Sequence, residues 1–193
     1  MEYRQLGKSG VRVSVIGLGT NRFGSARVPQ REVSSIIDAA LELGINHIDT
    51  ANRYQGGRSE EVLGVAMRGR RERFVVASKF TMPVGDGPND KGASRYHMMN
   101  GVESSLRRLQ TDHIDLYYVH RWDPLTPLEE TLRALDDLVR MGKIRYVGVS
   151  TFTSWQLAKA NLLSEVRGWT PVVAIQSEYN LLRREPERDV LPY

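Results

Sequence analysis

The chain has 193 residues, 40% hydrophobic and 26% charged, which is typical of one globular domain rather than of a disordered or fibrous protein. It has no cysteine, no apolar run near the roughly 20 residues that cross a bilayer and no apolar signal at its start. We therefore exclude disulfides and thiolate zinc sites and expect a cytoplasmic protein without membrane insertion. The net charge of +4 is not gathered on one periodic face, so we expect no nucleic-acid partner.

Six short runs rich in β-branched residues recur along the chain, and each is followed by a segment with the pattern of an amphipathic helix. Their nearly continuous apolar character is typical of parallel strands that are buried on both faces. The predicted strands are Val13–Thr20, Ile45–Thr50, Phe74–Phe80, His113–His120, Arg145–Ser150 and Val172–Ser177. The predicted helices are Arg31–Leu43, Ser59–Arg68 with Ser59 as its N-cap, Ser94–Leu109, Leu128–Met141 and Ser154–Leu163.

The repeat of strand and helix, about 32 residues long, fits either an open doubly wound sheet or a closed barrel, and the spacing alone does not separate them. The positions of polar residues favour the barrel. Polar or small residues occur at the C-terminal ends of the predicted strands, namely Gly19, Thr20, Asn21, Asp49, Lys79, His120, Ser150 and Gln176. Polar groups at the ends of many strands are typical of a barrel active site, whereas an open sheet gathers its ligand groups at one switch point. We therefore predict an α/β fold of the parallel (β/α)8 barrel type.

Several stretches, in order along essentially the whole chain, resemble the aldo-keto reductase family. They are Gly17–Thr20, Ile48–Gly64, Ala77–Phe80, Ser105–Pro124, Met141–Ser150 and Ile175–Leu182. The resemblance implies reduction of a small aldehyde or ketone to an alcohol by hydride transfer from a nicotinamide cofactor. By the same resemblance the cofactor is NADPH, with NADH as the alternative.

The resemblance also implies a catalytic tetrad of Asp49, Tyr54, Lys79 and His120. As the hydride reaches the carbonyl carbon, the oxygen develops negative charge and needs a nearby proton donor. A free tyrosine phenol is too weak an acid at neutral pH unless a cation stabilises its phenolate, and Lys79 can supply that cation. We expect Tyr54 to be the general acid, Asp49 to orient Lys79, and His120 to form a second hydrogen bond to the substrate oxygen or relay the proton.

The expected cofactor and substrate contacts come from the same resemblance. Ser150 and Gln176 match positions that hold the nicotinamide carboxamide. The family commonly has Asn after that serine, and the threonine found here, Thr151, can make only one of the two amide hydrogen bonds. Gly19, Thr20 and Asp49 are also expected to contact the cofactor. The substrate mouth is expected to be lined by Asn21, Tyr54 and Trp122.

Each of these residues also has a simpler interpretation. Asp49 and Lys79 could form only a structural ion pair, and a single tyrosine is usually half-buried packing. Their joint placement at successive strand ends favours a catalytic site. The four histidines have no pair spaced four residues apart, so we predict no metal site. Gly17 and Gly19 do not begin a dinucleotide fingerprint, because Arg22 occupies the place of its third glycine.

A complete barrel of this type needs about 250 residues, and only six of its eight units can be found. The sequence after the sixth strand looks like the sixth helix, in which the chain stops at Asp189–Tyr193. We therefore interpret residues 1–193 as a single barrel domain that is incomplete at its C-terminus. We expect it to be poorly stable alone or to associate through its open strand edges. The region that reads the cofactor phosphate is not found, so the choice between NADP and NAD stays open. Two alternatives to the reductase function remain, a cofactor-binding regulatory subunit of the potassium-channel β type and an inactive barrel fragment.

Overall fold

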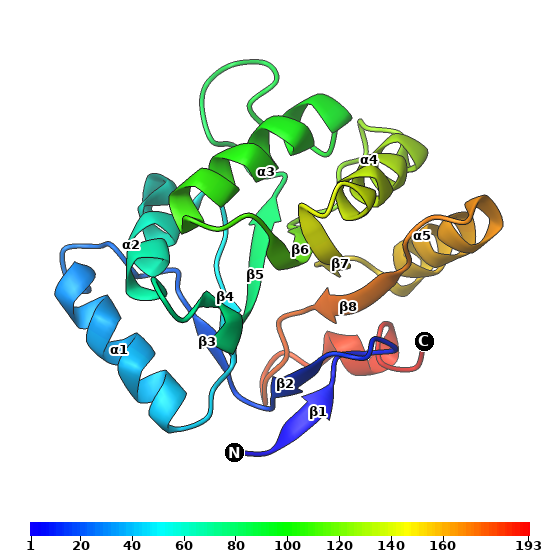
Figure 1. The fold of residues 1–193 in the computed structure, drawn as a ribbon. Helices are drawn as coiled ribbons and strands as arrows, with labels where there is room; N and C mark the ends of the chain where they lie inside the picture. The colour runs from blue at the N-terminus through cyan, green and yellow to red at the C-terminus, as the bar shows by residue number, and fades with distance from the viewer.

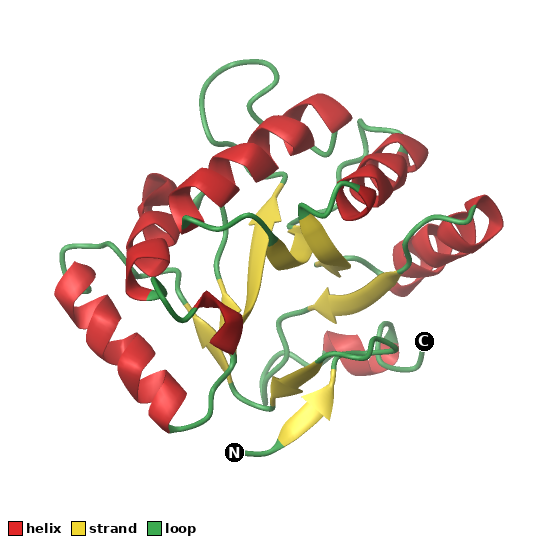
Figure 2. Ribbon diagram, in the orientation of Figure 1, coloured by secondary structure: helices red, strands yellow, loops and turns green.

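The computed structural model describes all 193 residues and is built around a six-stranded parallel sheet (Figures 1 and 2). Its strands are β3 (Gly17–Gly19), β4 (His47–Asp49), β5 (Val75–Phe80), β6 (Ile114–Val119), β7 (Ile144–Ser150) and β8 (Val172–Gln176). The strands lie side by side in chain order, without the reversal of an open doubly wound sheet. The sheet curls, and the helices lie along its outer side (Figure 1). The predicted fold is confirmed as a partial (β/α)8 barrel.

Five helices connect these strands and cover the outer face of the sheet (Figure 2). They are α1 (Gln30–Glu42), α2 (Arg58–Ala66), α3 (Arg95–Leu109), α4 (Leu128–Arg140) and α5 (Ser154–Arg167). The predicted helices therefore all exist, with small changes at their ends. The prediction of Ser59 as the N-cap is wrong. The helix α2 begins at Arg58, with Gly57 as its N-cap, and Ser59 is buried inside the first turn. The predicted last helix ends too early, because α5 continues to Arg167.

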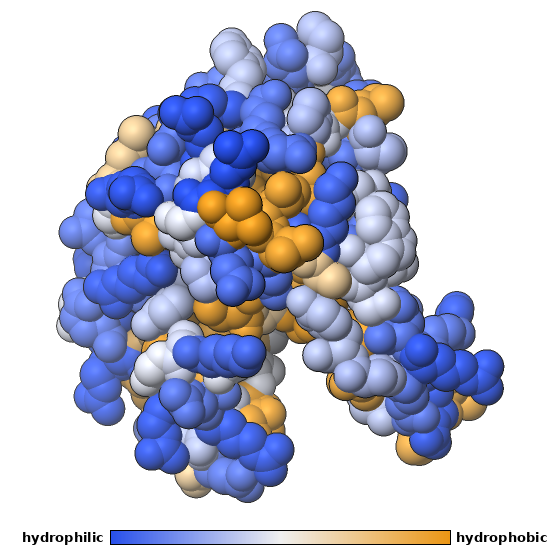
Figure 3. Space-filling view, turned by 90° about the vertical axis from the view of Figure 1, so that its right-hand side faces the viewer, coloured by the Kyte–Doolittle hydropathy of each residue, from blue (hydrophilic) through white to orange (hydrophobic).

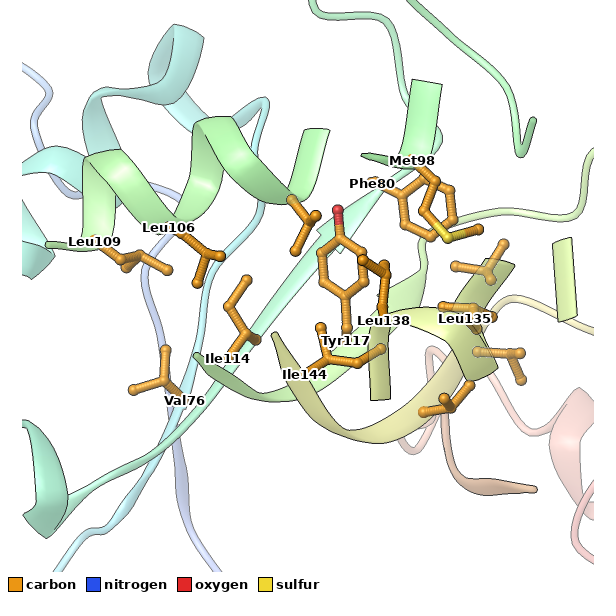
Figure 4. Packing of buried hydrophobic residues seen from close by; sticks show 14 of the residues in the cluster. Val76, Phe80, Met98, Leu106, Leu109, Ile114, Tyr117, Leu135, Leu138 and Ile144 are labelled. Atoms are coloured by element: carbon orange, nitrogen blue, oxygen red, sulfur yellow. The ribbon is translucent and has the colours of Figure 1, made fainter. Parts of the chain in front are cut away.

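Successive side chains of each strand point to opposite faces of the sheet, so the buried hydrophobic residues form two separate clusters. A cluster of 31 buried residues lies on the outer side of the sheet, beneath the helices, and includes Val76, Phe80 and Tyr117 (Figure 4). The phenol ring of Tyr117 stacks on Phe80 with 5.1 Å between ring centroids. Intervening residues such as Ala77 and Leu116 belong to a separate, smaller cluster. Because successive strand residues face opposite sides, Lys79 shares its face of β5 with Ala77 and points to the inside of the curl.

A hairpin that the sequence analysis did not predict precedes the sheet. Its strands, β1 (Tyr3–Gln5) and β2 (Arg12–Ser14), pair in antiparallel register. The single strand predicted at Val13–Thr20 is therefore wrong, because its first residues belong to the hairpin and only Gly17–Gly19 joins the parallel sheet. Leu6 packs against the inner cluster, and a Cβ on Gly7 would lie 2.1 Å from the carbonyl oxygen of Val173. The hairpin thus lies close against β8.

The C-terminal segment also differs from the prediction. The sequence after β8 was expected to continue into a sixth helix, but only one short 3-10 helix, η3 (Glu185–Arg188), forms there. Asp189 follows it and accepts hydrogen bonds from the backbone and hydroxyl of Ser154, at the start of α5. This segment therefore caps α5 instead of covering the sheet.

The two edge strands, β3 and β8, each have one neighbour in the sheet. Seen from the side that carries α5 and the C-terminus, the molecule is deeply notched between two arms, with hydrophobic side chains near the middle of the face (Figure 3). No helix is both long enough and apolar enough to cross a membrane. Low stability or association through the open edges stays a prediction.

Substitution of Gly64 by alanine tests how closely α2 packs on α3. A Cβ at Gly64 would lie 2.6 Å from the carbonyl oxygen of Arg108 and 2.7 Å from that of Leu109. Because backbone atoms cannot move aside cheaply, we expect Gly64→Ala to lower the free energy of unfolding by about 1–3 kcal/mol. Urea unfolding measures this change. Gly10→Ala is the matched control, because its Cβ would meet nothing within 4 Å; equal midpoints for both variants would contradict the packing described here.

Candidate active site

The centre of the candidate site is the ammonium group of Lys79, which is fully buried. Its Nζ lies 2.6 and 2.5 Å from the two carboxylate oxygens of Asp49. It also donates hydrogen bonds to the carbonyl oxygen of Thr50 at 2.9 Å and to the hydroxyl of Tyr54 at 3.2 Å. An ammonium has three donors, and the carboxylate, the carbonyl and the phenol use all of them. The charge of Lys79 is therefore fixed beside the phenol.

Tyr54 and His120 face each other on the same side of the sheet. Their ring centroids are 6.0 Å apart and their planes nearly perpendicular, at 79°. Burial, together with the positive charges of Lys79, Arg53 and Arg121, lowers the pKa of His120 to about 4, against the opposing effect of Asp49. The imidazole is therefore neutral at pH 7, and its Nδ1 is buried without a hydrogen-bond partner. The structure thus brings together all four residues of the expected tetrad.

Backbone pairing between strands sets this arrangement. Asp49 at the end of β4 pairs in register with Ala77 of β5, so Lys79 extends past the end of the neighbouring strand. The amide of Asn52 then donates a hydrogen bond to the carbonyl oxygen of Lys79 at 3.1 Å. The chain that follows β4 therefore stays beside the C-terminal end of β5. Tyr54 begins the 3-10 helix η1 (Tyr54–Gly57), whose second residue, Gln55, adopts a left-handed φ of 51°. This tight turn places Tyr54 over Lys79.

A buried group of hydroxyls supports the turn, and the sequence analysis did not identify it. The hydroxyl of Ser59 lies 2.9 Å from that of Thr20 and 3.1 Å from that of Thr50, and all three residues are fully buried. Ser59 also donates to the carbonyl oxygen of Thr20 at 2.8 Å. The side chain of Thr20, expected to contact the cofactor, is thus engaged in joining β3, β4 and α2. Ser59 was predicted only as an N-cap and lies in the family-like stretch Ile48–Gly64, and neither feature indicated these partners.

The expected nicotinamide contacts lie at the ends of the next strands. Ser150 and Gln176 are register partners on β7 and β8. Neither side chain forms a hydrogen bond within the chain. A hydroxyl and a primary amide together offer the donors and acceptors that a carboxamide needs, so these residues fit a nicotinamide. Gly19, at the end of β3, is exposed and leaves open space where a side chain would otherwise project.

Thr151 has a backbone conformation that is unusual for a β-branched residue. It adopts a left-handed φ of 56°, which asparagine accepts more readily than a β-branched residue does. Its hydroxyl donates to the carbonyl oxygen of Ser150 at 2.7 Å, and its amide donates to that of Gln176 at 3.0 Å. The hydroxyl is therefore already used locally, unlike the side chains of Ser150 and Gln176.

The other two residues expected at the substrate mouth, Asn21 and Trp122, occupy loops. Asn21 is exposed, and its carbonyl oxygen accepts a hydrogen bond from the side chain of Gln55 at 2.9 Å. Trp122 is half-buried and packs edge-on against Phe152 and Trp155, with 5.2 and 5.7 Å between ring centroids. Trp122 also lines a cleft of about 580 Å³. Asn21 is therefore attached to the turn that carries Tyr54, whereas Trp122 forms part of the wall of the cleft.

Comparisons with a family model and with curated proteins agree on one family. A model of the aldo/keto reductase family matches residues 15–193. The uncharacterised oxidoreductase YrpG of Bacillus subtilis is 43% identical over the whole of this chain, and the aldo-keto reductase YhdN of the same bacterium is 40% identical. A probable voltage-gated potassium channel subunit beta of Oryza sativa is 37% identical, again over the whole chain.

These matches cover 62%, 58% and 60% of the respective relatives. The chain therefore spans about three fifths of the length of the curated relatives it matches. The matched region nevertheless contains nearly all of this chain, including every residue of the site described above. The chain belongs to the aldo/keto reductase family.

Proposed function

We propose that this chain carries the catalytic centre of an NADPH-dependent oxidoreductase that reduces aldehydes or ketones to alcohols. The observation that carries the proposal is the contact of a buried, ion-paired Lys79 with the hydroxyl of Tyr54, at the C-terminal ends of the strands. Barrel enzymes have their active sites at this end. Membership of the family supports the same reaction class.

Tyr54 is the proposed general acid. When bound, the reduced nicotinamide supplies the hydride that adds to the carbonyl carbon. Tyr54 gives its proton to the carbonyl oxygen, so that the product is a neutral alcohol and the residue is left as a phenolate. The ammonium of Lys79 stabilises that phenolate, and Asp49 keeps the ammonium in place.

His120 contributes as a neutral hydrogen-bond donor. An uncharged imidazole carries one N–H, which can donate to the substrate oxygen without adding a second positive charge beside Lys79. On the other side of the site, Ser150 and Gln176 would hold the carboxamide and orient the nicotinamide ring. The proposed preference for NADPH over NADH rests on resemblance to the family alone.

The titration of His120 tests its neutral state directly. We expect its imidazole to protonate near pH 4, well below the usual value of about 6.5, because burial and the adjacent cations disfavour the charged form. Nuclear magnetic resonance measures this, with His120→Asn to assign the signal. The unfolded chain then binds more protons than the folded one between pH 4 and 6.5, so stability falls as pH falls through this window. A midpoint above pH 6 would contradict the described environment.

Replacement of Tyr54 by phenylalanine tests the general acid. We expect Tyr54→Phe to lower kcat for carbonyl reduction at least about a hundredfold, because the proton donor is lost. Cofactor affinity should stay nearly unchanged, since the expected carboxamide contacts are elsewhere. Oxidation of the nicotinamide, followed by absorbance in the complete protein, measures the rate. Tyr96→Phe is the matched control on the exposed face of α3 and should keep full activity; retained turnover in Tyr54→Phe would remove this residue from the role.

Replacement of Lys79 by methionine tests the cation. We expect Lys79→Met to abolish activity, because the phenolate loses its stabilising charge and the phenol loses a hydrogen bond. The variant also leaves Asp49 without its partner, which costs about 3–5 kcal/mol when a buried pair is broken. Lys79→Met combined with Asp49→Asn removes both charges. The double variant should regain stability in urea unfolding without regaining activity, and wild-type turnover in either variant would refute the pairing.

A cofactor-binding channel subunit is the alternative, since one relative carries that name at an identity similar to that of the reductases. The tetrad itself does not distinguish the two functions, whereas a measurement of turnover does. Reduction of simple aldehydes at rates of about 1 per second or more supports the reductase, whereas tight cofactor binding without turnover supports the alternative.

A further inference from the structure

A second feature lies beside the proposed catalytic residues, in the cleft of about 580 Å³ that Trp122 lines. The loops that follow β4, β5 and β6 form its walls. Three of the lining residues are cationic, namely Arg53, Lys91 and Arg121, and one is acidic, namely Asp123. None of the residues proposed to orient the nicotinamide, on β7 and β8, lines this cleft.

The cationic residues of the cleft have no partner within the chain. Arg53, Lys91 and Arg121 form no ion pair and no side-chain hydrogen bond, although most arginines outside the cleft form one or both. Arg71, for example, pairs with Asp115 at 2.7 Å. The cleft therefore presents unpaired donors to whatever enters it.

The single carboxylate of the cleft is occupied by its own loop. Asp123 accepts hydrogen bonds from the amides of Ala93 and Leu125, at 2.8 and 3.0 Å, and from the hydroxyl of Thr126 at 2.7 Å. These bonds lower the pKa of Asp123, although its burial acts as the largest opposing effect. Because its oxygens already accept these hydrogen bonds, Asp123 forms no ion pair with the three cationic residues. The cleft keeps an excess of positive charge.

The chain positions of two of the cations tie the cleft to the reaction centre. Arg53 directly precedes Tyr54, and Arg121 directly follows His120. Both arginines line the cleft, and their positive charges are among those that lower the pKa of His120. A group held by these arginines would thus belong to the same small molecule as the reacting carbonyl.

We propose that this cleft binds an anionic group, a carboxylate or a phosphate, on the carbonyl substrate. The guanidinium fork matches both groups in shape and charge, and Lys91 adds a further cation. Trp122 supplies an apolar wall for the carbon chain between the anion and the carbonyl. The substrate class is therefore an aldehyde or ketone that carries a negative charge. This inference rests on the proposed reductase function for the carbonyl half of the molecule.

Two substrates of nearly equal size test the preference in the complete protein, 4-formylbenzoate and the neutral 4-formylbenzamide. We expect kcat/KM to be at least about tenfold higher for the carboxylate. In Arg53→Gln and in Arg121→Gln the ratio between the two substrates should fall by roughly tenfold. Arg133→Gln, on the exposed side of α4, is the matched control, because this arginine also lacks an ion-pair partner and lies outside the cleft; its ratio should not change.

Calorimetric binding of benzoate and benzamide separates this inference from the reductase proposal, because it needs no turnover. Tighter binding of benzoate that is lost in both cleft variants supports the anion site even if no carbonyl is reduced. Equal affinities for benzoate and benzamide overturn the anion site even if both aldehydes are reduced. A tenfold loss of NADP⁺ affinity in Arg53→Gln or Arg121→Gln would also overturn it, because the cations would then serve the cofactor phosphate. Thermal unfolding verifies that each variant folds.

Discussion

The ion pair between Asp49 and Lys79 is the interaction on which the site depends. An ammonium removed entirely from water costs several kcal/mol unless a charge and hydrogen bonds replace the lost solvent. Here a carboxylate with 16% of its side chain exposed, a backbone carbonyl and a phenol replace it. Because β4 and β5 are neighbours in the sheet, this pair can form only when the strands are in their observed register. The geometry of the candidate site and the strand pairing therefore stabilise each other.

The opposite face of β5 is also held by buried polar contacts. Ser78, adjacent to Lys79 in sequence, donates a hydrogen bond to Glu60 of α2 at 2.5 Å. Glu60 is fully buried and pairs with Arg108 of α3 at 2.7 Å. One strand thus carries the cation of the candidate site on its inner face, and on its outer face it carries a hydrogen bond to a buried ion pair. The helices hold the strand in place without taking part in the chemistry.

Much of this could be predicted from the sequence, because the apolar strand runs and the polar residues that end them are local patterns. The six parallel strands, the barrel type and the meeting of Asp49, Tyr54, Lys79 and His120 all follow from such patterns and the family resemblance. The hairpin before β3 did not, since its strands are only three residues long and largely exposed. Ser59 was misassigned because a serine at a helix start resembles a cap, whereas its hydroxyl serves tertiary contacts. The unpaired cations of the cleft come from three separate loops, and only the fold brings them together.

In the proposed reaction, a nicotinamide lies between the ends of β7 and β8 and the hydroxyl of Tyr54. A crystal structure of the complete protein with NADP⁺ is the most direct measurement of it. We expect the carboxamide to contact Ser150 and Gln176 and the nicotinamide ring to face Tyr54. A nicotinamide bound away from these three residues, with Lys79 still paired to Asp49, would contradict it.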